Sequence, residues 1–306
     1  ILEKEIERQV YSDGAGKEQS THYHEFITEL YLIAVILARK NGIHFSEGLN
    51  LRLENMCEFI MHMMDDNLRP LHIGDSDDGV ALKFGVSEEA QNAVSLINTA
   101  CILFNRPDFK ICGDYLDEKS LWLMGYEGYA KYSAMEKADS KQGSKCFSES
   151  GYYIMRNREL CISFDCGGLG YLSLASHGHA DSLSINLNVW EMPVFIDPGT
   201  YLYHSCGKWR DYFRGTSAHN TIKIDKLDQS EIEGPFLWGY KARSFLKYWS
   251  QNCRIDRVCG YHTGYTRLSD PVSHARGITF DKYNNEIVIT DSIFSKKRHL
   301  VEQFFH

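Results

Sequence analysis

The chain has 306 residues, of which 43% are hydrophobic and 24% charged, a balance typical of a folded globular protein rather than a disordered one. Its formal net charge of −8 at pH 7 argues against nucleic acid or an anionic membrane as a partner. No apolar stretch is long enough to cross a bilayer, the nearest being residues 30–38, so we expect no membrane insertion.

The ends of the sequence and its cysteines bear on processing and location. The chain begins without Met or a charged-then-apolar leader, and it ends inside an expected strand, so we expect that both ends are cut. Nine cysteines with no Cys-x-x-Cys pair predict neither a disulfide framework nor a thiolate zinc site. Reduced buried thiols are the simpler interpretation, and they leave a cytoplasmic location open.

The first part of the chain predicts helices. Apolar residues recur at helical spacing from Glu25 to Lys40, and Asn41-Gly42 supplies a stop signal. The same pattern predicts three more helices: 49–64, 87–105 with a Ser-Glu-Glu cap, and 116–126. Helices of similar length joined by polar loops favour an array of antiparallel helical hairpins, which we assign to residues 1–134.

After about residue 143 the pattern changes to short alternating or β-branched runs punctuated by Gly, Asp and Asn. The expected strands are 152–156, 160–165, 183–189, 193–196, 220–224 and 286–291. This spacing is typical of an antiparallel sandwich or barrel, which we assign to residues 145–306. The polar segment 135–144 is the expected linker, and the predicted fold class is α+β with more than one domain.

Two imidazoles stand one residue apart in the second part, at His177 and His179, and Asp197 and His219 follow on later segments. In an extended chain, residues i and i+2 point to the same face, so both histidines can address one site. Zinc takes imidazole and carboxylate ligands, and His179, Asp197 and His219 supply a set of three. The alternative is that the histidines are hydrogen-bonded sheet residues and that Asp197 starts a turn.

Tyr23 and His24 stand at the entrance of the first strong helix. They are either packing and capping groups or part of a polar constellation in a cavity. The segment 74–79 resembles the opening of a calcium loop, but Val86 occupies the position where an EF-hand needs Glu. It is read as a solvated acidic turn or as the lining of a helical cavity.

The segment from Trp209 to Arg214 interleaves aromatic rings with guanidinium groups. Such a segment suits stacking against sugar rings and pairing with a carboxylate or sulfate. A surface cluster of aromatic and charged residues is the alternative. No nucleotide-binding glycine loop, P-loop or serine elbow is present in the sequence, so kinase and serine-hydrolase functions lack support.

In combination, these motifs closely resemble the heparinase II/III-like polysaccharide lyases. The resemblance covers most of the chain, and it implies an α/α toroid, here partial, followed by an antiparallel β-sandwich that is truncated at its C-terminal end. The segments that carry it are 18–24, 176–184, 195–203, 212–221, 228–231 and 236–239.

The resemblance also implies roles for individual residues. Tyr23 matches the tyrosine that acts on the leaving oxygen, and His177 matches the first histidine of the loop beside the cleft. The zinc ligands match His179, Asp197 and His219, and the zinc is mainly structural. Further substrate contacts are expected from a second cleft tyrosine, Tyr201 or Tyr203, and from His24, Trp209 and, more weakly, Arg214.

The implied reaction is β-elimination on a uronic acid residue of an acidic polysaccharide, such as a glycosaminoglycan or alginate. It needs neutralisation of the carboxylate, a base at C5 and an acid at the leaving oxygen. Tyr23 is the expected acid and a candidate base, with His177 assisting. The family also carries an Asn-His pair upstream of the tyrosine; this sequence lacks it, so the fragment is expected to be inactive unless a longer protein supplies it.

Two other functions stay open at this point. A noncatalytic glycan-binding protein could keep the lyase scaffold and its zinc for capsule or exopolysaccharide metabolism, and the acidic net charge favours it. A hydrolase could use Asp75 and Asp78 as paired carboxylates. The family resemblance implies a periplasmic or secreted location, against the indication from the cysteines.

Overall fold

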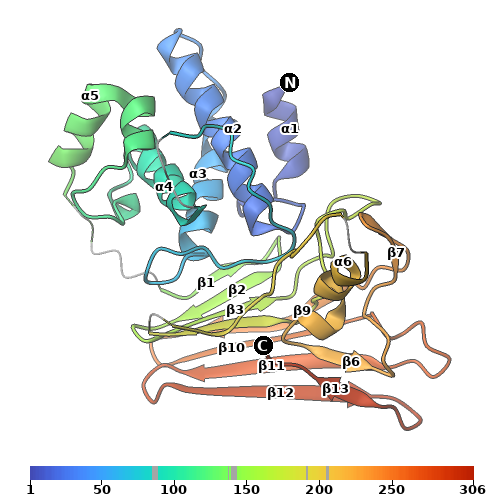
Figure 1. Ribbon diagram of the computed structural model, residues 1–306. Coiled ribbons are helices and arrows are strands. Elements are labelled where there is room, and N and C mark those ends of the chain that lie inside the picture. Colours follow the sequence, from blue (N-terminus) through green and yellow to red (C-terminus); the bar gives the residue numbers. More distant parts are fainter. Residues whose placement is uncertain (85–88, 137, 139–142, 191, 205–206) are drawn as a thin grey trace. The chain divides into compact units, whose positions relative to one another are not determined.

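The computed structural model describes residues 1–306 except 85–88, 137, 139–142, 191 and 205–206 (Figure 1). The chain divides into two compact units. The helical unit comprises Ile1–Gly16, Thr21–Pro70 and Asp77–Gln142. The sheet unit comprises Lys17–Ser20, Leu71–Ser76 and Gly143–His306. Two short segments from the N-terminal part of the sequence therefore belong to the sheet unit.

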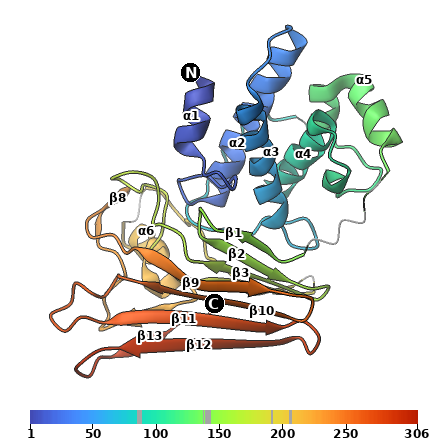
Figure 2. The same ribbon diagram turned by 180° about the vertical axis from the view of Figure 1, so that it is seen from behind.

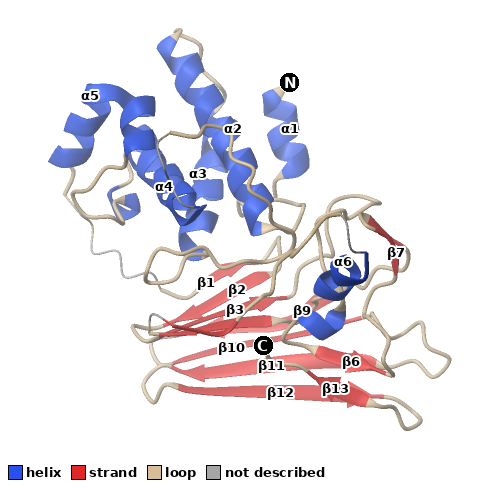
Figure 3. Cartoon of the chain, viewed as in Figure 1, coloured by secondary structure: helices blue, strands red, loops and turns tan. Residues whose placement is uncertain are grey.

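The helical unit contains five α-helices and one short 3-10 turn among its described residues (Figure 3). They are α1 (Leu2–Gln9), α2 (Thr21–Lys40), α3 (Glu47–His62), α4 (Glu89–Phe104), η1 (Pro107–Phe109) and α5 (Glu118–Ala134). One apolar cluster on facing sides of these helices forms the core, with Leu53, Met56 and Ile97 fully buried in it.

The four predicted helices are confirmed, but their bounds differ. α2 begins at Thr21, four residues earlier than expected, so that Tyr23 lies in its first turn. α5 continues to Ala134 because Gly125, at φ 68°, bends the chain and allows a second helical stretch. Helix α1 was not predicted, and the predicted cap at Ser87 lies outside the described residues.

The sheet unit contains thirteen strands, one α-helix and one 3-10 turn among its described residues. The strands are β1 (Lys145–Phe147), β2 (Tyr152–Arg156), β3 (Leu160–Asp165), β4 (Ile185–Val189), β5 (Met192–Phe195), β6 (Ile222–Ile224), β7 (Ile232–Gly234), β8 (Leu237–Trp238), β9 (Ser244–Gln251), β10 (Ile255–His262), β11 (Ser273–Asp281), β12 (Glu286–Phe294) and β13 (Val301–Gln303). The helical pieces are α6 (Gly207–Arg214) and η2 (Thr216–Ala218).

All strand pairs in this unit are antiparallel, as the sequence predicts. Five strands pair in the order β1-β2-β3-β4-β5, and four pair in the order β12-β11-β10-β9 (Figures 1 and 2). Phe164 of the first sheet and Val258 and Phe280 of the second belong to one buried cluster. The two larger sheets therefore share a hydrophobic core.

A buried polar chain crosses the four-stranded sheet. His262 Nε2 lies 3.0 Å from His274 Nδ1, and His274 Nε2 lies 2.7 Å from Asp291 Oδ1. Arg276, which has no exposed surface, pairs with the same carboxylate through Nε and Nη2 at 2.8 and 3.0 Å. Nη1 of Arg276 donates to the carbonyl of Leu183 at 2.9 Å and to that of Asn220. Arg276 thus connects the end of the β3–β4 loop, at Leu183, with the residue after His219.

Among the described residues, no helix combines the length and the apolar character that a bilayer crossing requires.

Candidate functional site

The loop that joins β3 to β4 carries both histidines of the motif that the sequence singles out. It runs from Cys166 to Ser184, and Gly178 between the two histidines makes a close approach that only glycine allows, since a Cβ would lie 1.4 Å from the carbonyl oxygen of Leu169. The loop packs Ala175 and Ala180 against Trp238. The histidines are therefore fixed by a packed loop rather than by a strand.

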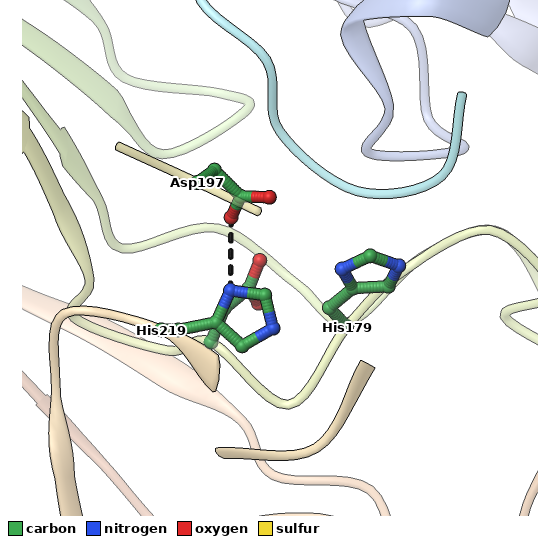
Figure 4. A group of neighbouring side chains, drawn as sticks. His179, Asp197 and His219 are labelled. Atoms are coloured by element: carbon green, nitrogen blue, oxygen red, sulfur yellow. Dashed lines mark hydrogen bonds and ion pairs between the residues drawn. The ribbon is translucent and has the colours of Figure 1, made fainter. Parts of the chain in front are cut away.

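His179, Asp197 and His219 come together as the sequence predicts, although the spacing between them spans 40 residues (Figure 4). Asp197 is the second residue after β5, and His219 is the first residue after η2. His219 Nδ1 lies 2.9 Å from Asp197 Oδ2, and the ring centroids of the two histidines are 5.2 Å apart.

A fourth residue, Asp181, joins this group, and one possible ligand atom from each of the four lies within 4.8 Å of the others. The sequence places Asp181 two positions after His179, and a carboxylate so near a predicted ligand is the signal that could have found it. The alternative interpretation, in which the histidines are only hydrogen-bonded, does not explain why four possible ligand atoms lie so close together. We call His179, Asp181, Asp197 and His219 the metal cluster.

Two tests indicate that these residues fit a metal ion. Among the buried polar atoms of the described residues, His179 Nδ1 and His219 Nε2 have no hydrogen-bond partner, so each imidazole keeps one nitrogen for a ligand. The negative charge is also in excess. Burial raises the pKa of Asp181, and burial together with the neighbouring Asp181 raises the pKa of Asp165 beside the cluster. A divalent cation would balance these carboxylates.

His177 points to a different partner, the buried carboxylate of Asp75. Its Nδ1 lies 3.3 Å from Asp75 Oδ2, and its ring meets Phe236 edge-on with centroids 6.1 Å apart. Its side chain is 21% exposed, so solutes can reach it. Asp75 itself has no exposed surface and pairs with Arg210. The prediction of a solvated acidic turn is therefore wrong at Asp75, and this carboxylate is not placed to serve a hydrolase with Asp78.

Tyr23 lies in the first turn of α2 and is bonded to the carboxylate of Asp77. Its hydroxyl donates to Asp77 Oδ2 at 2.9 Å, and His22 Nε2 lies 3.0 Å from the other oxygen. Asp77 also accepts the amide of Gly79 at 2.8 Å. Burial tends to raise the pKa of Asp77, but the bonds from Gly79 and Tyr23 lower it overall. The carboxylate of Asp77 therefore accepts the hydroxyl of Tyr23 and fixes the position of its ring.

His24, predicted to contact substrate, is instead a core residue of the helical unit. It is 2% exposed, its Nδ1 accepts the amide of Gly16 at 3.1 Å, and its Nε2 lies 3.0 Å from the carbonyl of Met56. Burial lowers the pKa of His24 to about 4, so the ring is neutral and its two nitrogens are satisfied internally. The capping and packing interpretation holds for this residue.

The other predicted substrate contacts gather around α6. Trp209 and Tyr201 are 49% and 60% exposed, and Tyr201 stacks on Phe213 with ring centroids 5.0 Å apart. Tyr201 also has φ 60°, an unusual conformation for a bulky residue. Tyr203 is half-buried against Phe236. We call Tyr201, Trp209, Tyr212 and Phe213 the aromatic surface.

A pocket of about 460 Å³ adjoins this surface. Arg210, Asp211 and Glu233 are the charged residues among those that line it. The residues that line it are Tyr203, His204, Gly207, Arg210, Asp211, Ile232, Glu233, Gly234 and Pro235. This combination of exposed rings and adjacent hydrogen-bonding groups suits a sugar.

Arg214 is not exposed for the substrate contact that the sequence suggests. Its side chain has no exposed surface, and its donors reach the carbonyls of Pro235 at 3.0 Å and of Gly234. The neighbouring Arg210 was not predicted, because the aromatic and charged segment looks like a surface cluster when α6 is not recognised. In the helix, these two arginines turn inward and the aromatic rings turn outward.

Comparisons with known proteins agree over both units. A family model described as "Heparinase II/III-like, C-terminal" matches residues 139–306, and one described as "Heparinase II/III N-terminus" matches residues 1–92. Among curated proteins, a heparin-sulfate lyase of Bacteroides thetaiotaomicron is 26% identical over 250 residues, which cover 78% of this chain and 34% of that protein. A heparin-sulfate lyase of Bacteroides stercoris is 22% identical and is matched over 97% of this chain and 39% of its own length.

Solved structures show the same fold. A heparinase III superimposes with a TM-score of 0.75 at 21% identity, covering 98% of this chain and 42% of that one. The heparan sulfate lyase HepC from Pedobacter heparinus gives 0.72 at 18% identity, covering 97% and 41%. The chain thus spans less than half the length of these relatives.

Proposed function

The chain belongs to the heparinase II/III-like family, and on that premise we propose that it acts in a polysaccharide lyase that cleaves a uronic-acid-containing polysaccharide by β-elimination. The curated relatives are named heparin-sulfate lyases, which supports a sulfated or unsulfated glycosaminoglycan as the substrate class. The observation that carries the proposal is the phenol of Tyr23, which donates a hydrogen bond to Asp77 at 2.9 Å.

Tyr23 supplies the acid that β-elimination demands. The departing oxygen at C4 must receive a proton as the bond to it breaks, and the phenol proton can be given to it once the hydroxyl turns from Asp77 to the bound substrate. Asp77 keeps the ring of Tyr23 in one position at the start of α2. If Tyr23 also removes the C5 proton, its own proton must first leave, and Asp77 is the group placed to accept it.

His177 is the candidate for the base or for charge stabilisation. Its accessible imidazole is held at Nδ1 by Asp75, and a histidine has a suitable pKa for proton transfer near neutral pH. Neutralising the substrate carboxylate makes the C5 proton more acidic, and a protonated imidazole serves that purpose as well.

The aromatic surface and the pocket beside it are the proposed substrate contacts of the sheet unit. Sugar rings present flat C–H faces that pack on aromatic rings, and Trp209 and Tyr201 expose such rings on one side of α6. Of the two tyrosines that the resemblance offers for the cleft, Tyr201 is the more exposed. Tyr203 stacks under the guanidinium of Arg210, whose carbon lies 5.1 Å from the ring centroid.

We infer that the metal cluster binds zinc in a structural role. The residues that would hold it are His179, Asp197 and His219, with Asp181 as a further oxygen ligand. A bound zinc ion would tie the histidine loop, the chain after β5 and the chain after η2 to one point. Four protein ligands would fill a tetrahedral site, which supports a structural rather than a catalytic ion.

The finer features of the fold and the location are also proposals. The helices of residues 1–134 are proposed to be part of an α/α toroid, and residues 145–306 are proposed to form a β-sandwich. The core shared by the two larger sheets supports the second assignment. A periplasmic or extracellular location is proposed from the family alone.

The test is a Tyr23→Phe variant, made in a form of the protein that degrades heparan sulfate and assayed by the ultraviolet absorbance of the unsaturated product. Activity should fall by at least about 100-fold, the usual contribution of a positioned acid. Tyr31→Phe is the matched control, because it removes a hydroxyl from the same helix and should keep most of the activity. Product formation at the wild-type rate by Tyr23→Phe would reject the proposed role.

A noncatalytic glycan-binding protein remains the second candidate, and the aromatic surface favours it, because exposed rings bind sugars without any chemistry. This candidate would be supported if the wild-type protein binds heparan sulfate oligosaccharides without forming unsaturated product. The Trp209→Ala variant should then no longer bind them. Product mass separates both candidates from a hydrolase, since hydrolysis adds a water molecule to the products and elimination does not.

A further inference from the structure

Asp75 is a buried carboxylate that the proposed reaction does not yet use. It is fully buried, and four side chains from three other segments of the sheet unit contact it. They are His177 at 3.3 Å, His179 at 2.9 Å, Thr200 at 3.4 Å and Arg210 at 2.6 Å and through a second, shorter contact. A buried carboxylate that accepts hydrogen bonds from several side chains belongs to an ordered polar network and not to a solvated turn.

The main chain around Asp75 is fixed as firmly as its side chain. Its amide donates to the carbonyl of His177 at 2.9 Å, and its carbonyl accepts the hydroxyl of Ser20 at 2.6 Å. Gly74 has φ 70°, and a Cβ there would lie 2.6 Å from the carbonyl oxygen of Gln19 and 2.8 Å from that of His177. The segment thus lies directly against the histidine loop.

The guanidinium of Arg210 balances the charge. Both of its terminal nitrogens contact the two carboxylate oxygens, the bidentate arrangement that suits an arginine and a carboxylate. Arg210 is 2% exposed and also donates to the carbonyl of Pro235 at 3.1 Å. With this pair neutral overall, Asp75 can stay ionised in the interior and can only accept hydrogen bonds.

Because the Asp75 carboxylate can only accept hydrogen bonds, the nitrogen of each histidine that faces it must carry a proton. His179 Nε2 lies 2.9 Å from Asp75, so Nε2 holds the proton and Nδ1 keeps its lone pair. That Nδ1 is one of the buried atoms without a partner among the described residues, and His179 belongs to the metal cluster. By the same reasoning, His177 holds its proton on Nδ1 and keeps the lone pair on Nε2.

We propose that Asp75, supported by Arg210, is the positioning residue of the histidine loop. It sets the tautomers of His177 and His179 together, so that one carboxylate prepares both the proton-transferring imidazole and a metal-binding imidazole. This inference rests on the proposed lyase function for His177, but its consequence for His179 does not depend on any catalysis. A carboxylate behind a metal-binding histidine commonly changes metal affinity by 10- to 100-fold.

The experiment compares Asp75→Asn with Asp78→Asn, a matched removal of an exposed carboxylate from the same segment. Zinc alone is the probe, and its affinity is measured by competition with a chromophoric chelator. Asp75→Asn should bind zinc about 10- to 100-fold more weakly, because its amide cannot accept from every donor, while Asp78→Asn should match the wild type. Arg210→Lys keeps the charge without the bidentate geometry and should fall between them.

A second measurement needs no variant. Nitrogen-15 NMR of the histidine side chains in the wild-type protein should show His179 protonated at Nε2, with Nδ1 shifting when zinc is added. Zinc bound through Nε2, no zinc binding by the wild type, or equal zinc affinity of wild type and Asp75→Asn would each overturn the proposal. If the wild type has no lyase activity, the proposed function fails while these zinc and NMR results still decide the role of Asp75.

In an active form of the protein, Asp75→Asn should lower kcat more than it raises KM, because His177 loses the partner that orients its ring. An unchanged kcat would contradict the role of Asp75 toward His177.

Discussion

Replacing Asp291 by Ala tests whether the buried charges of the four-stranded sheet support the sheet unit. Asp291 accepts two bonds from Arg276, at 2.8 and 3.0 Å, and one from His274 at 2.7 Å. The alanine variant leaves a fully buried guanidinium with only two carbonyl partners, those of Leu183 and Asn220. It also removes the acceptor that orients His274.

The expected cost follows from the burial of these groups. Removing one partner of a buried ion pair costs about 3–5 kcal/mol of unfolding free energy, because the remaining charge stays desolvated. The side chain of Asp291 is 12% exposed, so water can enter the vacated space, and we expect a value near the lower end, about 3 kcal/mol. Burial tends to raise the pKa of Asp291, but the bonds from His274 and Arg276 lower it to about 2.

The assay is urea unfolding followed by tryptophan fluorescence, which reports mainly on the sheet unit because four of the five tryptophans, all but Trp122, belong to it. Glu286→Ala removes an exposed carboxylate from the same strand and should change the free energy by less than about 0.5 kcal/mol. The wild-type advantage should disappear as the pH falls from about 4 towards 2, where Asp291 becomes protonated in the folded protein. A loss below about 1 kcal/mol at pH 7 would refute the reasoning.

Three further outcomes are expected. Gly74→Ala should destabilise the sheet unit by more than about 1 kcal/mol in the same urea assay, because φ is 70° and two carbonyl oxygens occupy the space of a Cβ. Leu53→Ala should cost about 2–5 kcal/mol, seen as a lower helical melting temperature by circular dichroism, because Leu53 is fully buried. His299→Gln should lower the urea midpoint at pH 6 more than at pH 9. The hydrogen bonds that His299 donates to Asp225 and Asp270 raise its pKa, so its contribution to stability is full below the unfolded pKa and is lost as the pH rises through the folded one; equal effects at both pH values would contradict this.

Segments with a strong local pattern were predictable from the sequence. The strands Tyr152–Arg156 and Leu160–Asp165 have the predicted bounds, because apolar runs of strand length end at clear turn residues. Helix α6 was missed, since its aromatic face is exposed and its buried face carries Arg210 and Arg214, the reverse of the usual amphipathic pattern. The short α1 has no side-chain cap, which removes the usual signal for a helix start.

The site was predictable where its residues form motifs and not where burial decides their role. His179, Asp197 and His219 stand in recognisable segments, and the structure brings them together. Asp75 lies in a segment rich in Gly and Asp that reads locally as a turn. Its burial depends on Arg210, 135 positions away in the chain, and no local pattern contains that information.

The discontinuous make-up of the sheet unit has a practical consequence for anyone who dissects this protein. A piece cut at the boundary of the family match, residues 139–306, would retain Arg210 and both histidines but would lack the two short stretches Lys17–Ser20 and Leu71–Ser76. Its interior would then hold an arginine deprived of its counter-ion. Recombinant expression of that piece alone should yield insoluble material, and supplying a peptide that spans Leu71–Ser76 in trans is the natural route to rescue it.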